Sequence, residues 1–165
     1  MTENITEKIL ALLAKNAKLT AKEVAFSIGA EEKAVATEIA RLEKAGVIVG
    51  YGALINREKL DGENLTALIE VKVTPSRGKG FNGIAERIYR FDEVRAVYLM
   101  SGGYDLAVII EGKSLKEVAA FVSDKLSPLE SVLSTATHFV LKKYKDYGVI
   151  FSEGKEVDGR MLVSP

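Results

Sequence analysis

Residues 28–48 read IGAEEKAVATEIARLEKAGVI, and this stretch decides the fold of the N-terminal part of the chain. Apolar side chains recur in it at the three- and four-residue spacing of one helical face, at Val35, Ile39 and Leu42. Gly46 follows at the position where helices end in a left-handed conformation. The stretch therefore predicts a helix that begins near Glu31, ends before Gly46 and buries one side.

Two shorter helical patterns precede this helix. Apolar residues at helical spacing run from Ile5 to Leu13. Thr20, followed three residues later by Glu23, is the signature of a capping box that begins a second helix. Gly29 is placed to end that helix.

Residues 47–55, VIVGYGALI, follow the third helix and are rich in strand-forming side chains. Two glycines within this run suggest a bend or a wing hairpin. Three helices followed by such a ribbon, within about fifty residues, form the layout of a winged helix-turn-helix. We therefore assign residues 1–55 to a winged helix-turn-helix domain.

A different pattern begins after a polar stretch, residues 56–64, which we assign to a linker. Beyond it, strands and amphipathic helices follow one another in the order β-α-β-β-α-β, at 65–73, 81–91, 94–100, 106–110, 114–126 and 132–141. This order predicts a ferredoxin-like domain over residues 65–142, so the expected fold class is α+β. The tail, residues 143–165, is expected to form a hairpin from Val149–Phe151, a turn at Gly154–Gly159 and a return at Met161–Val163.

Composition excludes several kinds of site. The 165 residues include 23 basic and 23 acidic side chains, which gives no support to a nucleic-acid interpretation, and residues 1–50 are balanced as well. The absence of cysteine excludes disulfides and thiolate metal sites, and a single histidine, His138, excludes a multi-histidine site. We expect no cofactor and no metal.

The pattern of the first twenty residues is neither a signal peptide nor a membrane span, so a cytoplasmic protein without a membrane partner is expected.

The strand patterns also bear on assembly. Residues 106–110, LAVII, are apolar on both faces, and so are residues 132–141 in large part. Two helices cover only one face of a sheet, so the other face would expose an apolar patch. A second copy of the chain is the simplest cover. The alternative is that residues 142–165 fold back over this face.

Three motifs resemble those of the leucine-responsive/asparagine-regulator (Lrp/AsnC, feast/famine) family. Residues 28–48 resemble its helix-turn-helix signature, most specifically from Arg41 to Ile48. The segment Gly102 to Asp105, followed by Leu106, is similar to the family's Gly-x-x-Asp turn. Residues 132–141 look like its last strand. The resemblance covers roughly residues 4–142.

Membership of this family implies a homodimer, often assembled into tetramers or octamers, that binds operator DNA and responds to an amino acid or a related metabolite. Residues 65–142 would then bind the effector and form the oligomer. The resemblance places the effector against the turn and the threonines of the last strand, at Gly102, Gly103, Tyr104, Asp105, Thr135 and Thr137. A carboxylate can hold an α-ammonium group, and hydroxyls and turn amides can hold an α-carboxylate. The alternative is a turn-capping role for Asp105 and ordinary β propensity for the threonines.

The third helix would present one side to double-stranded DNA. With its apolar residues turned inward, its candidate contacts are Lys33, Thr37, Ala40 and Lys44 on the opposite side and Arg41 on the flank. These cations are placed to contact phosphates or guanine edges, and Thr37 a base. The chain departs from the family where it carries acidic residues, at Glu31, Glu32 and Glu38. Carboxylates near the groove face repel phosphate, which weakens the expected interaction.

Two other functions stay open at this point. The first is a ligand-sensing oligomer with weak or no DNA binding, which the neutral charge and the three acidic residues favour. The second is a tetrapyrrole-modifying enzyme on the same architecture, similar to siroheme decarboxylases. His138 is the only side chain suited to proton transfer near neutral pH, and a structural histidine is the more common role for such a residue on a strand. We therefore expect a regulator rather than an enzyme.

Overall fold

The computed structural model describes residues 4–60, 64–75, 78 and 80–151. The chain divides into two compact units, Met1–Ile55 and Asn56–Pro165. In the described part of the first unit the regular elements are helices, and the second unit carries the strands. Across the described ranges, no helix is both long enough and apolar enough to cross a lipid bilayer.

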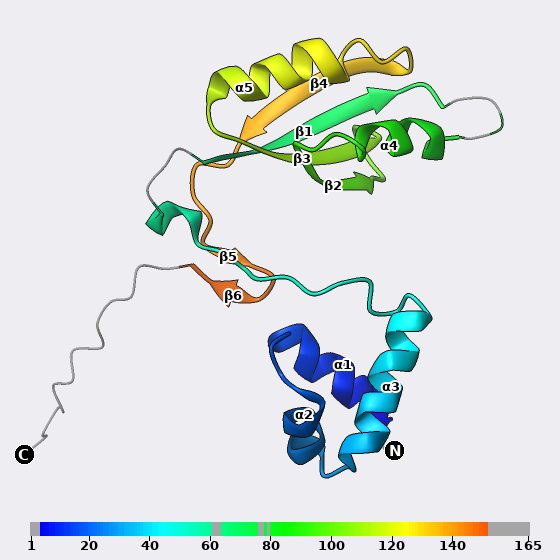
Figure 1. The fold of residues 1–165 in the computed structure, drawn as a ribbon. Helices are drawn as coiled ribbons and strands as arrows, with labels where there is room; N and C mark the ends of the chain where they lie inside the picture. Colours follow the sequence, from blue (N-terminus) through cyan, green and yellow to red (C-terminus); the bar gives the residue numbers. More distant parts are fainter. Residues whose placement is uncertain (1–3, 61–63, 76–77, 79, 152–165) are drawn as a thin grey trace, which may run out of the picture. The chain divides into compact units, whose positions relative to one another are not determined.

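The first unit contains the three predicted helices, α1 (Ile5–Lys15), α2 (Ala21–Ile28) and α3 (Glu32–Lys44) (Figure 1). The capping box is present: Thr20 Oγ1 accepts from the Glu23 amide at 3.2 Å, and the Glu23 carboxylate accepts from the Thr20 amide at 2.7 Å. Gly29 ends α2 with φ of 68°, a left-handed conformation that is strained for residues with a side chain. The three helices bury one apolar cluster, which includes Ile9, Leu13, Val24, Ala25 and Val35.

Of the bend and the wing hairpin that the sequence suggests for residues 47–55, the wing hairpin is wrong, because the structure assigns no strand to this described segment. Beyond Ile48, which packs against the helical cluster, the segment lies exposed, with Val49 92% and Tyr51 52% accessible. A hairpin needs a second apolar strand at turn distance, and the residues that follow Ile55 are polar instead. One short turn, Arg57–Lys59, forms in the predicted linker.

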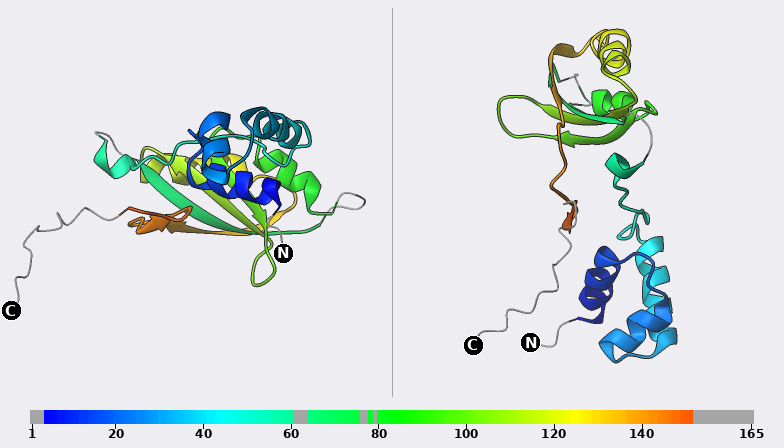
Figure 2. Two further views of the ribbon diagram at one scale, coloured as in Figure 1. Left: turned by 90° about the horizontal axis from the view of Figure 1, so that it is seen from below. Right: turned by 90° about the vertical axis from the view of Figure 1, so that its left-hand side faces the viewer.

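The second unit has the ferredoxin-like arrangement that the element order predicts. Its four-stranded antiparallel sheet has the strand order β2-β3-β1-β4. The elements are β1 (Leu65–Val73), α4 (Asn82–Ile88), β2 (Val94–Leu99), β3 (Leu106–Gly112), α5 (Leu115–Ala120), η2 (Phe121–Leu126) and β4 (Val132–Phe139). Helices α4 and α5 lie on the same face of the sheet (Figures 1 and 2).

Alternation along β1 separates a covered face of the sheet from an open one. Ala67, Ile69, Val71 and Val73 are buried and pack in one cluster with side chains of α4, α5 and η2. The intervening residues point to the other face, where Leu68 lies opposite Ile109 of β3 and Glu70 lies opposite Ala107. We call this the open face. Leu68, Ile109 and Ala107 form an apolar patch on it, as the sequence indicates, and Glu70 lies beside that patch.

The predicted helices of the second unit are shorter or less regular than the apolar periodicity suggests. The helix expected over residues 81–91 ends at Ile88, and Phe91 lies beyond it. The rings of Phe91 and Phe121 meet edge to face, with their centroids 5.6 Å apart. The helix expected over 114–126 begins at its Ser114 cap but continues from Phe121 as one π-helical stretch. Periodicity identifies the buried side chains without distinguishing an α-turn from a π-turn.

A short hairpin forms in the tail from β5 (Lys145–Asp146) and β6 (Val149–Ile150). Its turn has positive φ at both Tyr147 (43°) and Gly148 (82°), as the tight turns between antiparallel strands require. The Tyr147 side chain is hydrogen-bonded to Tyr98 of β2, which raises the pKa of Tyr98. The turn and return strand predicted at Gly154–Gly159 and Met161–Val163 lie outside the described residues.

Candidate DNA-reading face and effector site

Helix α3 exposes one side while its opposite side holds the core. Val35 is 0% accessible because it packs with side chains of α1 and α2, and Leu42 is 2% accessible. The five predicted DNA contacts are all exposed, at Lys33, Thr37, Ala40, Arg41 and Lys44. We call the exposed side formed by these five residues the reading face. The fold places them together as the helical spacing predicts.

These five side chains differ in the contacts that they already make. Thr37 Oγ1 donates to the backbone carbonyl of Lys33 at 2.8 Å, so its hydroxyl is bonded to the backbone of its own helix. Arg41 is paired with Glu38 by two hydrogen bonds, from Nε at 2.8 Å and from Nη2 at 2.7 Å. Within the described residues, neither Lys33 nor Lys44 has an ion pair. Of the three cations of the reading face, the two lysines are therefore the most available to an anionic partner.

Glu38 links two helices of the first unit. Besides the two hydrogen bonds from Arg41, its Oε1 accepts from the Thr6 hydroxyl of α1 at 2.6 Å. The hydrogen bonds from Arg41 and Thr6 lower the pKa of Glu38 from 4.5 to about 2. Glu38 is therefore ionised at any ordinary pH. The sequence places this acid at the border of the reading face, but its contact with α1 joins residues 32 positions apart and has no local pattern.

A hollow of about 290 Å³ lies beside the reading face. It is lined by Ala17, Leu19, Ala21, Ala36, Ile39, Ala40, Glu43 and Tyr51. The Tyr51 hydroxyl donates to Glu43 Oε1 at 2.8 Å, and this hydrogen bond raises the pKa of Tyr51. Of the predicted contacts only Ala40 lines the hollow. Sequence reasoning missed it, although small residues four positions apart, Ala36 and Ala40, are a pattern that leaves space on a helix surface.

The Gly-x-x-Asp turn connects β2 to β3. Asp105 Oδ2 accepts from the Val73 amide at 2.8 Å, and the Asp105 amide donates to the Val71 carbonyl at 3.1 Å. The aspartate thus holds the end of β1, through a bond to another strand rather than the cap of its own turn that the structural alternative predicts. Gly102 has φ of 150°, which residues with a side chain rarely adopt, and both turn glycines are exposed. The turn therefore offers backbone groups at the surface.

Thr135 and Thr137 lie on β4, on the other side of β1. Thr135 is opposite Val71 and Thr137 is opposite Ile69, so both point to the face that the helices cover. Both are half-buried. Since Leu106 also pairs with Val71, Asp105 and Thr135 flank the same end of β1, about 10 Å apart across two strand spacings. The predicted effector residues gather near one end of the sheet, with Thr137 set further back.

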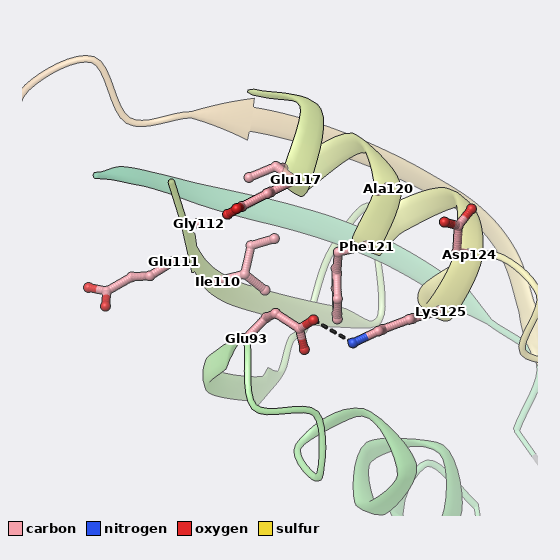
Figure 3. A pocket seen from close by; sticks show the side chains of 10 residues that line it. Glu93, Ile110, Glu111, Gly112, Glu117, Ala120, Phe121, Asp124 and Lys125 are labelled. Atoms are coloured by element: carbon pink, nitrogen blue, oxygen red, sulfur yellow. Dashed lines mark hydrogen bonds and ion pairs between the residues drawn. The ribbon is translucent and has the colours of Figure 1, made fainter. Parts of the chain in front are cut away.

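A pocket of about 240 Å³ opens elsewhere in the second unit, between the β3 end and the α5–η2 helix (Figure 3). Its floor is apolar, with Ile110, Val118 and Phe121, and none of the predicted effector residues lines it. At its rim Lys125 forms an ion pair with Glu93, and this contact lowers the pKa of Glu93. Sequence reasoning missed this pocket, because its lining comes from three separated segments.

His138 lies on the open face and not in either pocket. Its Nε2 is 3.3 Å from Glu70 Oε1 of the neighbouring strand, and both side chains are partly exposed, at 58% and 35%. Across the described ranges, no group of three or more His, Asp or Glu side chains is arranged to hold a metal ion. Glu70 and His138 therefore form a partly exposed pair between the neighbouring strands β1 and β4.

Comparison with known proteins assigns both units. Residues 3–49 match the winged helix-turn-helix DNA-binding family, and residues 66–150 match the Lrp/AsnC ligand binding domain. The chain is 54% identical to an uncharacterized HTH-type transcriptional regulator, YugG, of Bacillus subtilis, over all of this chain and 99% of that protein. It is 32% identical to the HTH-type transcriptional regulator FL11 of Pyrococcus furiosus, over 87% of this chain and 92% of that one.

Solved structures share the fold. A transcriptional regulator from Neisseria meningitidis, determined as a complex with L-Met, superposes with a TM-score of 0.72 at 24% identity, covering 88% of this chain and 94% of its own. AsnC of E. coli superposes with a TM-score of 0.65 at 20% identity, covering 87% of this chain and 94% of its own. The fold, the two domain matches and the identity over nearly the whole length agree. The chain belongs to the Lrp/AsnC family and is a DNA-binding transcriptional regulator of that type.

Proposed function

We propose that the chain binds duplex DNA through the reading face of α3 and regulates transcription in response to an amino acid bound at the second unit. The observation that carries the DNA half is the exposure of all five reading-face residues on one side of a helix whose other side is buried. A helix exposed in this way fits the major groove, which is about 12 Å wide.

The placement of charge along α3 supports this proposal. Lys33 and Lys44 lie at opposite ends of the reading face, about 16 Å apart at the rise of an α-helix. Between them the face carries the small side chains of Thr37 and Ala40. Small residues at the centre allow close approach to base edges, while lysines at the ends reach phosphates on either side of a groove. The neutral net charge does not oppose this arrangement, because the two lysines have no acidic partner among the described residues.

Removing both lysines tests the DNA half. Each phosphate contact contributes about 0.9 to the slope of log affinity against log salt, or roughly eightfold in affinity at 0.1 M salt. We call the first unit of one chain a head. We expect Lys33→Ala/Lys44→Ala to reduce that slope by about 1.8 per head and the affinity for random duplex DNA by roughly 60-fold. Fluorescence anisotropy across a salt series measures both. Lys113→Ala/Lys116→Ala, in the second unit, is the control and should leave both unchanged.

The effector half rests on the turn at Gly102–Asp105 and on Thr135. Asp105 is fixed by its hydrogen bond from the Val73 amide, so its carboxylate has a defined orientation for an α-ammonium group. The exposed turn amides and the Thr135 hydroxyl provide donors for an α-carboxylate at the same end of the sheet. The Neisseria relative bound to L-Met supports an amino acid as the chemical class of the effector.

Neutralising Asp105 tests the effector half. Asp105→Asn keeps an oxygen that accepts from the Val73 amide, so the turn should persist while the attraction for an ammonium group is lost. We expect the amino acid that binds the wild-type chain to bind at least about tenfold more weakly, because charge-assisted hydrogen bonds are about twice as strong as neutral ones. Calorimetric titration with the twenty amino acids measures this. Asp124→Asn, on η2, is the control; equal affinities in wild type and Asp105→Asn would place the effector elsewhere.

We also propose that the chain works as a homo-oligomer built through its open face. This face has an apolar patch around Leu68 and Ile109, with Glu70 beside it and with Lys72 and Glu111 nearer the ends of their strands. An apolar patch bordered by charged residues is the composition of a protein interface. Two copies that meet through the same face form a twofold dimer, which would hold two reading faces for two DNA half-sites.

A further inference from the structure

The arrangement of Thr6, Glu38 and Arg41 bears on how strongly the head holds DNA. Glu38 accepts two hydrogen bonds from the Arg41 guanidinium and one from the Thr6 hydroxyl, all between 2.6 and 2.8 Å. Its side chain is only 18% accessible, while that of Arg41 is 60% accessible. A carboxylate anchored to a second helix therefore holds a cation that is otherwise free to reach solvent.

The pair draws the guanidinium away from the centre of the reading face. At about 100° per residue, Lys33, Thr37 and Lys44 lie within about 30° of the direction opposite the core, whereas Arg41 lies about 50° and Glu38 about 110° from it. Because Glu38 is further round the helix than Arg41, bonding to Glu38 turns the guanidinium toward the flank. Thr6 fixes Glu38 in that position.

The ion pair also has an electrostatic consequence for a bound duplex. Nε and Nη2 of Arg41, the edge that makes a two-bond contact with a phosphate or carboxylate, are occupied by Glu38. A phosphate that approached Arg41 would either displace Glu38 or meet its negative charge. The Arg41 side of this ion pair is exposed, and exposed ion pairs add little to stability, so a contribution to folding does not by itself account for the arrangement.

We propose that Glu38 restrains DNA binding by holding Arg41 on the flank of α3, so that one cation of the reading face is withheld from the phosphate backbone. This inference rests on the proposed function of α3 and adds to it a residue that lowers affinity for DNA of any sequence. Glu38 is a positioning residue, since it acts through Arg41. The remaining affinity then depends on Lys33 and Lys44.

The first test compares the full-length wild type, Glu38→Gln and Glu31→Gln on random duplex DNA across a salt series. Glutamine keeps an oxygen that accepts from Thr6 but loses the charge that holds Arg41. We expect Glu38→Gln to raise affinity roughly eightfold per head at 0.1 M salt and to steepen the log–log slope by about 0.9, the value of one added phosphate contact. Glu31→Gln removes an equal charge from the start of α3, where the side chain caps nothing, and should leave the slope unchanged.

The second test adds Arg41→Ala to both backgrounds. In the wild type it should change affinity less than twofold, because Arg41 is already withheld; in Glu38→Gln it should remove the whole gain. This non-additivity is a readout that a purely structural role of Glu38 would not produce. The single variant Arg41→Ala leaves Glu38 in place, so it also tests the proposal if Glu38→Gln has a lowered melting temperature.

The outcomes separate this inference from the proposed function. Equal affinity and slope in wild type and Glu38→Gln would overturn the restraint but not the DNA contact of α3. Weaker binding by Glu38→Gln would show that Glu38 directs Arg41 toward DNA, and would overturn it as well. Binding by Glu38→Gln alone, without binding by the wild type, would support the restraint. If neither binds at low salt, both the proposed function and this inference fail.

Discussion

Replacing Ile9 by alanine is expected to unfold much of the first unit and with it to remove DNA binding. Ile9 is 0% accessible and packs in the single apolar cluster that joins the three helices. Isoleucine-to-alanine changes in such positions cost about 2–5 kcal/mol, from lost burial and from the cavity that remains. A domain of about 55 residues has little more stability than that in total. Thermal unfolding followed by circular dichroism, together with duplex binding, measures the two effects.

Phe26→Ala provides the matched control for this variant. Phe26 lies on α2 of the same unit but is 91% accessible. Its truncation removes more carbon atoms than Ile9→Ala does, yet it leaves no cavity in the core. We expect a change in unfolding free energy within about 0.5 kcal/mol, as for most surface substitutions. If Phe26→Ala were as damaging as Ile9→Ala, the cluster around Ile9 would not be what stabilises the head.

Ile109→Glu is expected to separate the proposed oligomer into folded monomers. Ile109 lies at the centre of the open face, opposite Leu68 of β1 and Ala96 of β2. In a monomer a glutamate there reaches water, but under a second copy it would be a buried charge without a partner, which costs about 3–5 kcal/mol. The dissociation constant of the dimer should rise at least roughly 100-fold. Sedimentation velocity at several concentrations measures it.

Lys116→Glu is the control for this second prediction. Lys116 is exposed on α5, on the covered side of the sheet, so the same acidic side chain should leave the association unchanged. An unaltered oligomer in Ile109→Glu would show that the open face does not form the interface, and the tail, residues 142–165, would then be the candidate to cover it.

Much of the fold follows from local sequence patterns, because its elements are fixed by residues close in the chain. Thr20 and Glu23 begin α2, Gly29 ends it, and Ser114 begins α5, each within four residues of the atoms that it bonds. The alternation in residues 65–73 gives the exact span of β1. The ferredoxin-like order then follows from the succession of elements.

The predictions that were incomplete depend on contacts between distant residues. Residues 47–55 have strand-forming side chains, but strand formation requires a partner that the described part of this chain does not supply. The spacing along α3 predicts the reading face, whereas the hydrogen bond from Thr6 to Glu38 spans 32 positions and appears only in three dimensions. For the same reason Asp105 is predicted at its turn, but its bond to the Val73 amide is not.

The salt dependence of wild-type binding to random duplex DNA tests the central claim most directly. If Lys33 and Lys44 of each head meet phosphates, log affinity should fall with log salt with a slope of at least about −1.8 per head, or about −3.6 for a dimer. Affinity measured between about 50 and 200 mM salt gives this slope. A slope near zero, or no binding at the lowest salt, would contradict the claim that α3 of the wild-type chain holds DNA.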